Sequence, residues 1–258
     1  MNTEIFIVSC AKHFPWLDYA LQSINKFASG FSRVTVAIPH TEMDALVERN
    51  IDCPSAIVRT GDEWPGKGML WHMSQIMRSD EWCPDADFIL HTDSDCIFTE
   101  PFSPDDYFVN GKPVLMHASF KWLINTQQAN LEMWQRAVAA AVGWKPSEET
   151  MRRHPAVHPR KIYAKARECI EAYTKMPCDD YIKSCENAFP QTFAEFPTLG
   201  AVAWRFFRND YHWIDQQREP FPHGKLAQFW GHAPPDQPQE PVVRGKPFRC
   251  TPSDLLKA

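Results

Sequence analysis

The N-terminal part of the chain alternates between apolar runs typical of β-strands and amphipathic segments typical of helices. The apolar run Glu4–Cys10 is followed by a helical period from Leu17 to Phe27. The β-branched run Arg33–Pro39 is followed by a short helical period from Met43 to Val47, and Ala56–Arg59 begins a third strand. Strands that alternate with helices build a mostly parallel sheet, so the sequence predicts an α/β fold.

A fourth strand pattern ends in two carboxylates. The turn-rich loop Gly61–Gly68 leads into a helical period from Met69 to Met77, and then comes the run FILHTDSDCIF, Phe88–Phe98, which carries Asp93 and Asp95. In a parallel α/β sheet, ligands bind outside the carboxyl ends of the strands. We therefore expect the aspartate pair to lie at the edge of the sheet where ligands bind.

The residue types at this edge suit a metal ion and a phosphorylated ligand. Asp93 and Asp95 are hard oxygen ligands of the kind that Mg²⁺ or Mn²⁺ prefers when it bridges nucleotide phosphates. Ser9 after the first strand and Arg59 in the third should come to the same edge. The alternative is that the two aspartates cap a turn or the next helix, since D-x-D also occurs by chance.

Composition agrees with one soluble domain. The chain has 258 residues with 44% hydrophobic content, and no apolar stretch approaches the roughly 20 residues that a membrane span needs. The N-terminus has no basic segment before its first strand, so we expect a cytoplasmic protein. Its eight cysteines include no C-x-x-C pair, which predicts reduced thiols and no zinc site.

A net charge of −5 excludes a uniformly basic nucleic-acid-binding protein, but one segment departs from this average. Arg152–Arg167 contains six basic residues and no acidic one. This segment is either a solvated helix face with its preceding loop or a groove for an anionic acceptor. The segment lies within a region predicted to be helical, Thr126 to about Lys175. A Pro-rich loop in this region contains His154 and His158. Its prolines prevent the single helical face that a metal site with this histidine spacing would need.

These patterns together resemble the glycosyltransferases of the GT-A fold, in particular the small bacterial and phage-type enzymes. The resemblance rests on the strand order, the D-S-D strand end, and the strand GKPVLMHASF, followed by a helical insert. It also rests on an F-x-E-F segment in Phe193–Trp204 and a W-x-H element in Gln228–Pro234. The resemblance implies a single GT-A-like domain, with a nucleotide-sugar-binding half at 1–120 and a half at 121–258 that holds the helical insert and completes the acceptor and metal sites.

The resemblance also implies roles for individual residues. His232 would complete the metal site of Asp93 and Asp95, and Glu195 would be the general base, with Asp180 as its rival in PCDDYIKS. The contacts to the donor, a UDP- or GDP-sugar, would come from the following residues: Ser9, Arg59, Lys67, Ser94, Trp122 and Trp230. Lys67 would assist Mn²⁺ or Mg²⁺ at the departing phosphate, and the two tryptophans would stack on a sugar or base.

Other functions remain open at this point. D-S-D-C-I also approximates the motif of haloacid-dehalogenase-like phosphatases, although that motif normally ends the first strand of its domain. A nucleotidyltransferase would use the same metal chemistry, and a non-catalytic nucleotide-sugar-binding module would keep the fold. The acceptor hydroxyl could belong to a glycan, a lipid-linked sugar or a hydroxymethylated base in phage DNA. If the protein is encoded by a phage, we expect it in the cytoplasm of the host.

Overall fold

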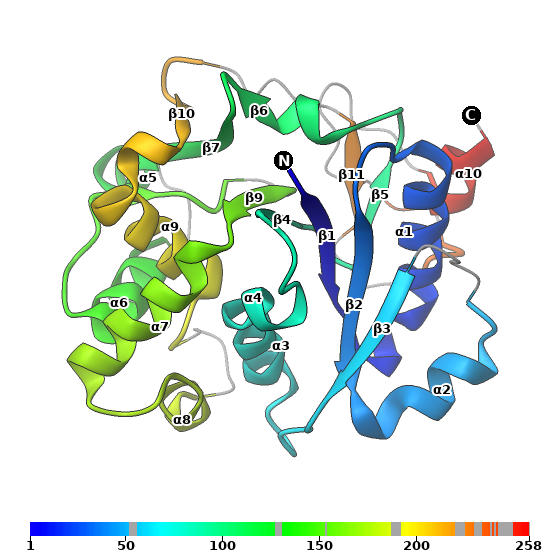
Figure 1. Cartoon of the computed structure of the whole chain (residues 1–258), viewed down its shortest axis with the longest axis horizontal. Helices are drawn as coiled ribbons and strands as arrows, with labels where there is room; N and C mark the ends of the chain where they lie inside the picture. The colour runs from blue at the N-terminus through cyan, green and yellow to red at the C-terminus, as the bar shows by residue number, and fades with distance from the viewer. Residues whose placement is uncertain are drawn as a thin grey trace.

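The computed structural model describes residues 1–51, 56–126, 131–152, 154–186, 192–219, 225–229, 234–237, 239, 241 and 250–257. At its centre is a five-stranded sheet with the order β3-β2-β1-β4-β9 (Figure 1). Its strands are β1 (Thr3–Val8), β2 (Arg33–Pro39), β3 (Ala56–Gly61), β4 (Phe88–His91) and β9 (Ala156–Pro159). The first four are parallel, and β9 runs antiparallel to β4.

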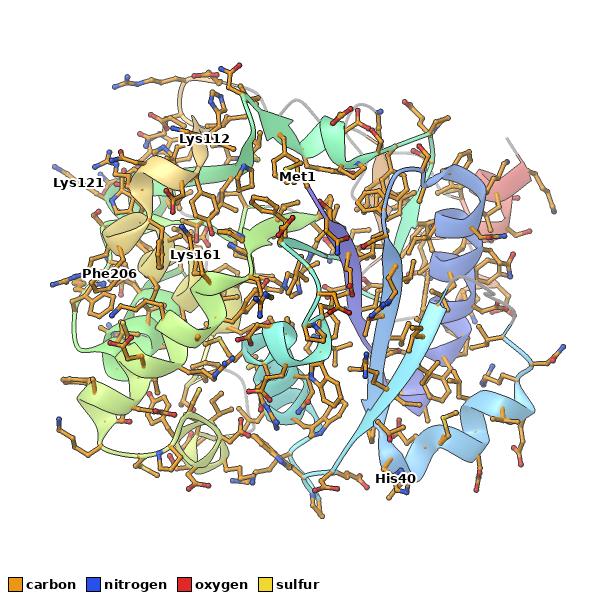
Figure 2. The ribbon with its side chains drawn as sticks, viewed as in Figure 1. Met1, His40, Lys112, Lys121, Lys161 and Phe206 are labelled. Carbon is orange, nitrogen blue, oxygen red and sulfur yellow. The ribbon has the colours of Figure 1, made fainter. Side chains whose placement is uncertain are left out.

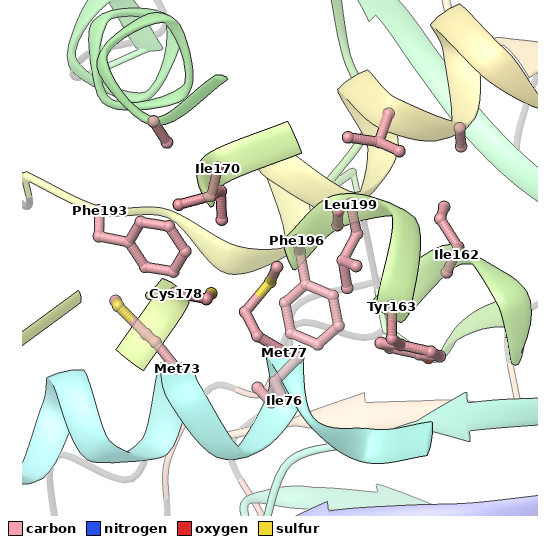
Figure 3. Packing of buried hydrophobic residues seen from close by; sticks show 14 of the residues in the cluster. Met73, Ile76, Met77, Ile162, Tyr163, Ile170, Cys178, Phe193, Phe196 and Leu199 are labelled. Atoms are coloured by element: carbon pink, nitrogen blue, oxygen red, sulfur yellow. The ribbon is translucent and has the colours of Figure 1, made fainter. Parts of the chain in front are cut away.

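Helices cover both faces of this sheet because its central strands are apolar on both sides. Along β1, Ile5 and Ile7 pack against α1 (Phe14–Phe27) and α2 (Met43–Glu48). Phe6 and Val8 point the other way, toward the second and larger core. Helices α3 (Gly68–Met77), α6 (Leu131–Val142), α7 (Lys161–Thr174), α8 (Cys178–Ser184) and α9 (Glu195–Phe206) contribute to that core, and the short α4 (Ser79–Trp82) packs against it. Figure 3 shows Met73, Met77 and Phe196 meeting there.

Further strands and helices lie outside the central five-stranded sheet. The other strands are β5 (Cys96–Phe98), β6 (Phe108–Val109), β7 (Lys112–Ser119), β8 (Glu148–Glu149), β10 (His212–Asp215) and β11 (Leu226–Gln228). The other helices are α5 (Phe120–Asn125) and α10 (Pro252–Lys257), with short 3₁₀ helices η1 (Ala11–His13), η2 (His40–Glu42), η3 (Pro104–Tyr107) and η4 (Arg208–Asp210). Helices α6 and α7 lie in the segment predicted to be helical, Thr126 to about Lys175, and β8 and β9 lie between them.

The predicted fold class, α/β with a mostly parallel sheet flanked by helices, is confirmed. The seven cysteines that the structure describes are all free thiols, as predicted. Within the described part of the chain, no helix is long and apolar enough to cross a membrane.

Two predictions about local structure were wrong. The run Phe88–Phe98 is two strands, because the chain leaves β4 after His91 and turns through residues 92–95 before β5. The Pro-rich loop between the predicted helices contains β9, which pairs with β4 at His91↔Ala156. A strand of four residues flanked by prolines carries little periodic signal, and its pairing with a buried strand is a long-range contact.

Candidate active site

The aspartate pair opens into a small cavity where β1 and β4 end. The cavity has a volume of about 140 Å³ and is lined by Val8, Ser9, Cys10, His13, His72, Asp93, Ser94 and Asp95. Its walls come from the loop after β1, from α3 and from the turn after β4. The predicted ligand-binding edge of the sheet is therefore hollow at the aspartate pair.

Two buried serines tie the walls of the cavity together. The Ser94 hydroxyl donates to Ser9 Oγ at 2.8 Å and lies 3.4 Å from the Val8 carbonyl oxygen. The backbone N–H of Ser9 donates to the Ala37 carbonyl at 2.9 Å, which anchors this loop to β2. Both serines predicted to contact the donor thus lie in the cavity, beside the carboxylates.

Asp93 forms an ion pair with His154. The distance between Asp93 Oδ2 and His154 Nε2 is 2.9 Å. The pairing of β4 with β9 explains this contact, because continuing the antiparallel register past His91↔Ala156 brings these two residues opposite each other. Burial alone would raise the pKa of Asp93, but the charge and hydrogen bond of His154 hold it below its ordinary value.

Asp95 is in a different electrostatic environment. Its side chain is 9% exposed, and burial followed by the negative charge of Asp93 raises its pKa to about 6. The Cys96 thiol donates to Asp95 Oδ1 at 3.8 Å, and the Phe229 N–H donates to the Asp95 carbonyl oxygen at 3.0 Å. Among the residues that the structure describes, Asp95 forms no ion pair like that of Asp93 with His154, and a bound cation would relieve the repulsion between the two aspartates.

Glu195 lies near enough to Asp93 and His154 to interact electrostatically with both. It is the first residue of α9 and is 8% exposed. Burial, with a smaller contribution from the charge of Asp93, raises its pKa to about 7. The neighbouring ring of Phe196 meets the rings of His91 and His154, with centroids 5.3 Å apart in both pairs. The N-terminal end of α9 is therefore packed against the residue that pairs with Asp93.

Three histidines at the site had no role in the sequence analysis. His13 and His72 line the cavity, and His154 pairs with Asp93. Burial lowers the pKa of His72, so that its imidazole is neutral at neutral pH. Isolated histidines on a helix and in a loop carry no spacing signal, and only the packing of α3 and β9 beside β4 brings them together.

Four other predicted site residues do not line the cavity. Arg59 lies in β3, and its buried Nε has no hydrogen-bond partner in the described structure. Lys67 precedes α3 and donates to the Lys183 carbonyl oxygen, and Asp180 is exposed in the first turn of α8. Trp122 lies in α5 and packs on a separate apolar cluster. His232 and Trp230 lie outside the described residues.

The basic segment is engaged by acidic residues from elsewhere in the chain. Arg152 is paired with the buried Glu149 at 2.8 Å, and it also donates to Gln216 Oε1 at 2.5 Å. Arg167 donates to both oxygens of Asp80, at 2.6 and 2.9 Å. Lys161 pairs with Asp210 at 2.5 Å. These three charges are therefore compensated although the segment itself contains no acidic residue.

The described residues contain no cluster of three or more histidines, cysteines, aspartates or glutamates that could hold a metal ion. Asp93 and Asp95 nevertheless provide two carboxylates at one cavity, which is the donor type that Mg²⁺ and Mn²⁺ prefer. The raised pKa of Asp95 shows that its charge is poorly compensated by the protein itself. These observations fit a divalent ion held by the two aspartates.

The site and fold together define an α/β protein with a D-x-D pair at the carboxyl end of its sheet. No family model matches the chain, and no curated protein matches it. Among solved structures, the chain is similar to the galactosyltransferase LgtC in complex with donor and acceptor sugar analogues, with 13% identity and a TM-score of 0.45. The match covers 70% of this chain and 69% of that one.

Proposed function

We propose that this protein is a metal-dependent glycosyltransferase that moves a sugar from a nucleotide-sugar donor to a hydroxyl acceptor. The observation that carries the proposal is the arrangement of Asp93, Asp95 and Glu195. Two carboxylates share a cavity at the carboxyl end of β4, and Glu195, a buried glutamate with a pKa of about 7, precedes Phe196, whose ring packs on His154. In this proposal the two aspartates bind the metal ion and Glu195 is a separate proton acceptor.

Asp95 is proposed as the main metal-binding carboxylate. Asp93 is already oriented by its ion pair with His154 and would supply the second carboxylate. A bound Mn²⁺ or Mg²⁺ would supply charge stabilisation for a departing nucleoside diphosphate. His232 is the proposed third ligand, and the chain reaches it three residues after Phe229, whose N–H is bonded to Asp95.

Glu195 is proposed as the general base. A base works best when its pKa is near the working pH, and burial brings Glu195 to about 7. Its role would be to accept the proton of the acceptor hydroxyl as that oxygen attacks the sugar. Asp180 remains a weaker candidate because it is exposed on α8, whereas Glu195 is buried.

The donor is proposed to be a UDP- or GDP-sugar held at the cavity by Ser9 and Ser94. Arg59, Lys67 and Trp122, which do not line the cavity, remain proposed donor contacts together with Trp230. The cavity belongs to residues 1–120, whereas His154 and Glu195 come from 121–258. This division supports the assignment of donor binding to the first half and of acceptor activation to the second.

A glycan-type hydroxyl is the proposed acceptor. Arg152, Lys161 and Arg167 are engaged by Glu149, Asp210 and Asp80, so three of the cations that a DNA groove would use are already compensated. Replacing Arg152 would also leave the buried Glu149 without its partner, so its substitution would test stability rather than acceptor binding.

The test is product analysis with a panel of nucleotide sugars and Mn²⁺. A transferase releases a nucleoside diphosphate, whereas a phosphatase would release inorganic phosphate and a nucleotidyltransferase given a triphosphate would release pyrophosphate. We expect nucleoside diphosphate release that chelation abolishes and that Asp95→Asn lowers at least 100-fold. Asp105→Asn, at an exposed position in η3, is the matched control. No product from any donor, or full activity of Asp95→Asn, would contradict the proposal.

A further inference from the structure

One outer surface of the protein combines exposed aromatic rings with basic side chains. It begins with the sequence Trp204–Arg208, WRFFR, where α9 ends. We call this surface the α7–α9 patch and define it by the following residues: Trp144, Lys161, Lys165, Tyr173, Trp204, Arg205, Phe206, Phe207 and Arg208. Figure 2 labels Phe206 and Lys161 on the side of the molecule that α7 and α9 form.

Two aromatic rings of the patch are exposed, those of Tyr173 and Phe206, and they pack beside Gly143 and Trp144. Phe206 is 45% exposed and meets the ring of Trp144 edge-on at 5.9 Å. Tyr173, also exposed, packs its ring against Gly143, the residue before Trp144. Exposed large aromatic side chains that adjoin one another are uncommon on a monomeric surface and mark a place where something docks.

Each of four cations of the patch lies over one of its rings. The Arg205 guanidinium is 4.5 Å from the centroid of Trp144, and that of Arg208 is 4.0 Å from the centroid of Trp204. The Lys165 and Lys161 ammonium groups lie 4.9 Å from Phe206 and 5.1 Å from Phe207. Because these cations already cover ring faces, the rings are poorly available for stacking on nucleobases or sugars.

The patch is positively charged although the chain as a whole is negative. Lys161 is paired with Asp210 and Lys165 with Glu168, but Arg205 and Arg208 have no ion pair within the described residues. The patch also borders a groove of about 660 Å³, whose basic residues Lys112, Arg160 and Lys161 are matched by Asp80, Asp87 and Asp210. The excess positive charge of the patch therefore comes from Arg205 and Arg208, on a protein whose net charge is −5.

We propose that the α7–α9 patch docks the protein on an anionic lipid surface. Trp and Phe side chains enter the headgroup region with their ring edges, while Arg and Lys reach the lipid phosphates beside them. Each basic side chain near such a surface contributes about 1 kcal/mol. This surface lies apart from the aspartate cavity, so the proposal stands independently of the reaction carried out there.

The test is co-sedimentation of the full chain with vesicles. Pure phosphatidylcholine vesicles are compared with vesicles that contain an equal share of phosphatidylglycerol. We expect binding only to the anionic vesicles, and weaker binding as salt increases. The double substitution Arg205→Ser, Arg208→Ser should lower the partition coefficient about 30-fold, since two contacts of about 1 kcal/mol are lost. Phe206→Ser should weaken binding without changing its dependence on salt.

The matched control removes two charges elsewhere: Arg49→Ser and Lys257→Ser, both exposed and near α2 and α10 on the other side of the molecule in Figure 1. This control should bind vesicles like the unmodified protein. All variants should keep their melting temperature and their nucleotide-sugar hydrolysis in solution. The proposal is overturned if the chain does not bind anionic vesicles, or if the patch variants bind as well as the control. It is also overturned if a single-stranded oligonucleotide binds to the patch and the vesicles do not.

Discussion

At the scale of single residues, the site shows how three carboxyl groups acquire different properties. Asp93 is held ionised by His154, whereas the pKa of Asp95 is raised to about 6 and that of Glu195 to about 7. Burial is the largest cause of each upward shift, and the charge of Asp93 adds to both. The environments of the three groups separate a permanently charged carboxylate from a group suited to accept a proton.

Glu195→Gln tests the proposed base. The amide keeps the shape of the side chain but cannot accept a proton, so transfer should fall about 100-fold or more while donor binding remains. In the unmodified protein the rate should rise with pH through about 7, because only the ionised carboxylate acts as a base. The variant should lose that rise. A silent Glu195→Gln together with an inactive Asp180→Asn would reverse the two roles.

The same group predicts a change in stability with pH. The pKa of Glu195 is raised in the folded protein, so its stabilising contribution is fully present below its unfolded pKa and is lost as pH rises through about 7. The free energy of unfolding of the unmodified protein relative to Glu195→Gln should therefore fall by on the order of 2–3 kcal/mol between pH 4 and pH 8. Denaturant unfolding at several pH values measures this difference, and a constant difference would contradict the buried position of Glu195.

At the scale of elements, α9 and α7 determine how the second half of the chain meets the site. Helix α9 presents Glu195 at its first turn, and α7 packs on both α9 and the helical layer beside β4. Two close contacts hold these helices in place. One is the approach of Gly200 to Thr150, and the other is the ion pair of Arg167 with Asp80.

Gly200→Ala should destabilise the protein although alanine favours helices. A Cβ at Gly200 would lie 1.6 Å from Thr150 Oγ1, so α9 would have to move. We expect a loss of about 1–3 kcal/mol in the free energy of unfolding and a fall in activity, because α9 carries Glu195. Gly68→Ala at the start of α3 meets no atom within 4 Å and is the control. Equal melting temperatures for the two variants would contradict this packing.

Arg167→Ala should also be destabilising. Its guanidinium donates to Asp80 and to the Met77 carbonyl oxygen, and the two side chains are 18% and 12% exposed. Leaving Asp80 without its partner should cost about 2–4 kcal/mol in chemical denaturation. Arg136→Ala, which breaks a pair whose arginine is 80% exposed, should cost less than about 0.5 kcal/mol. Similar losses of unfolding free energy for Arg167→Ala and Arg136→Ala would show that burial does not make the first ion pair more important for stability than the second.

At the scale of the whole molecule, two cores share one sheet, and the cavity lies where the carboxyl ends of β1 and β4 meet. A ligand bound in that cavity stabilises the folded chain relative to the unfolded one. At 100 times its dissociation constant, a ligand adds about 2.7 kcal/mol, which for a chain of this length raises the melting temperature by about 5–10 °C.

We therefore expect a nucleoside diphosphate with Mn²⁺ to raise the melting temperature by this amount. The same nucleotide with a chelator should have little effect, and Asp95→Asn should abolish the shift. The Arg205→Ser, Arg208→Ser variant should keep the full shift, because the patch is separate from the cavity. Differential scanning fluorimetry measures all four cases, and an equal shift in Asp95→Asn would exclude that residue from donor binding.

The sequence by itself determined the elements whose signals are local. The periods of β1 to α3 and the aspartate pair just after β4 follow from residues close together in the chain, whereas Glu195 became a candidate through the resemblance to GT-A enzymes. Burial on both faces of the sheet also followed, because continuous apolar runs can be satisfied only between two helical layers.

Only the tertiary structure decided which side chains meet. The register of β9 against β4 brings His154 to Asp93, and the packing of α3 brings His72 to the same cavity. Asp80 and Asp210, far away in the sequence, compensate Arg167 and Lys161, which the charge pattern alone left as part of a possible groove. Such pairs lie far apart in sequence, and their contacts depend on strand pairing and helix packing, which no local period of residues encodes.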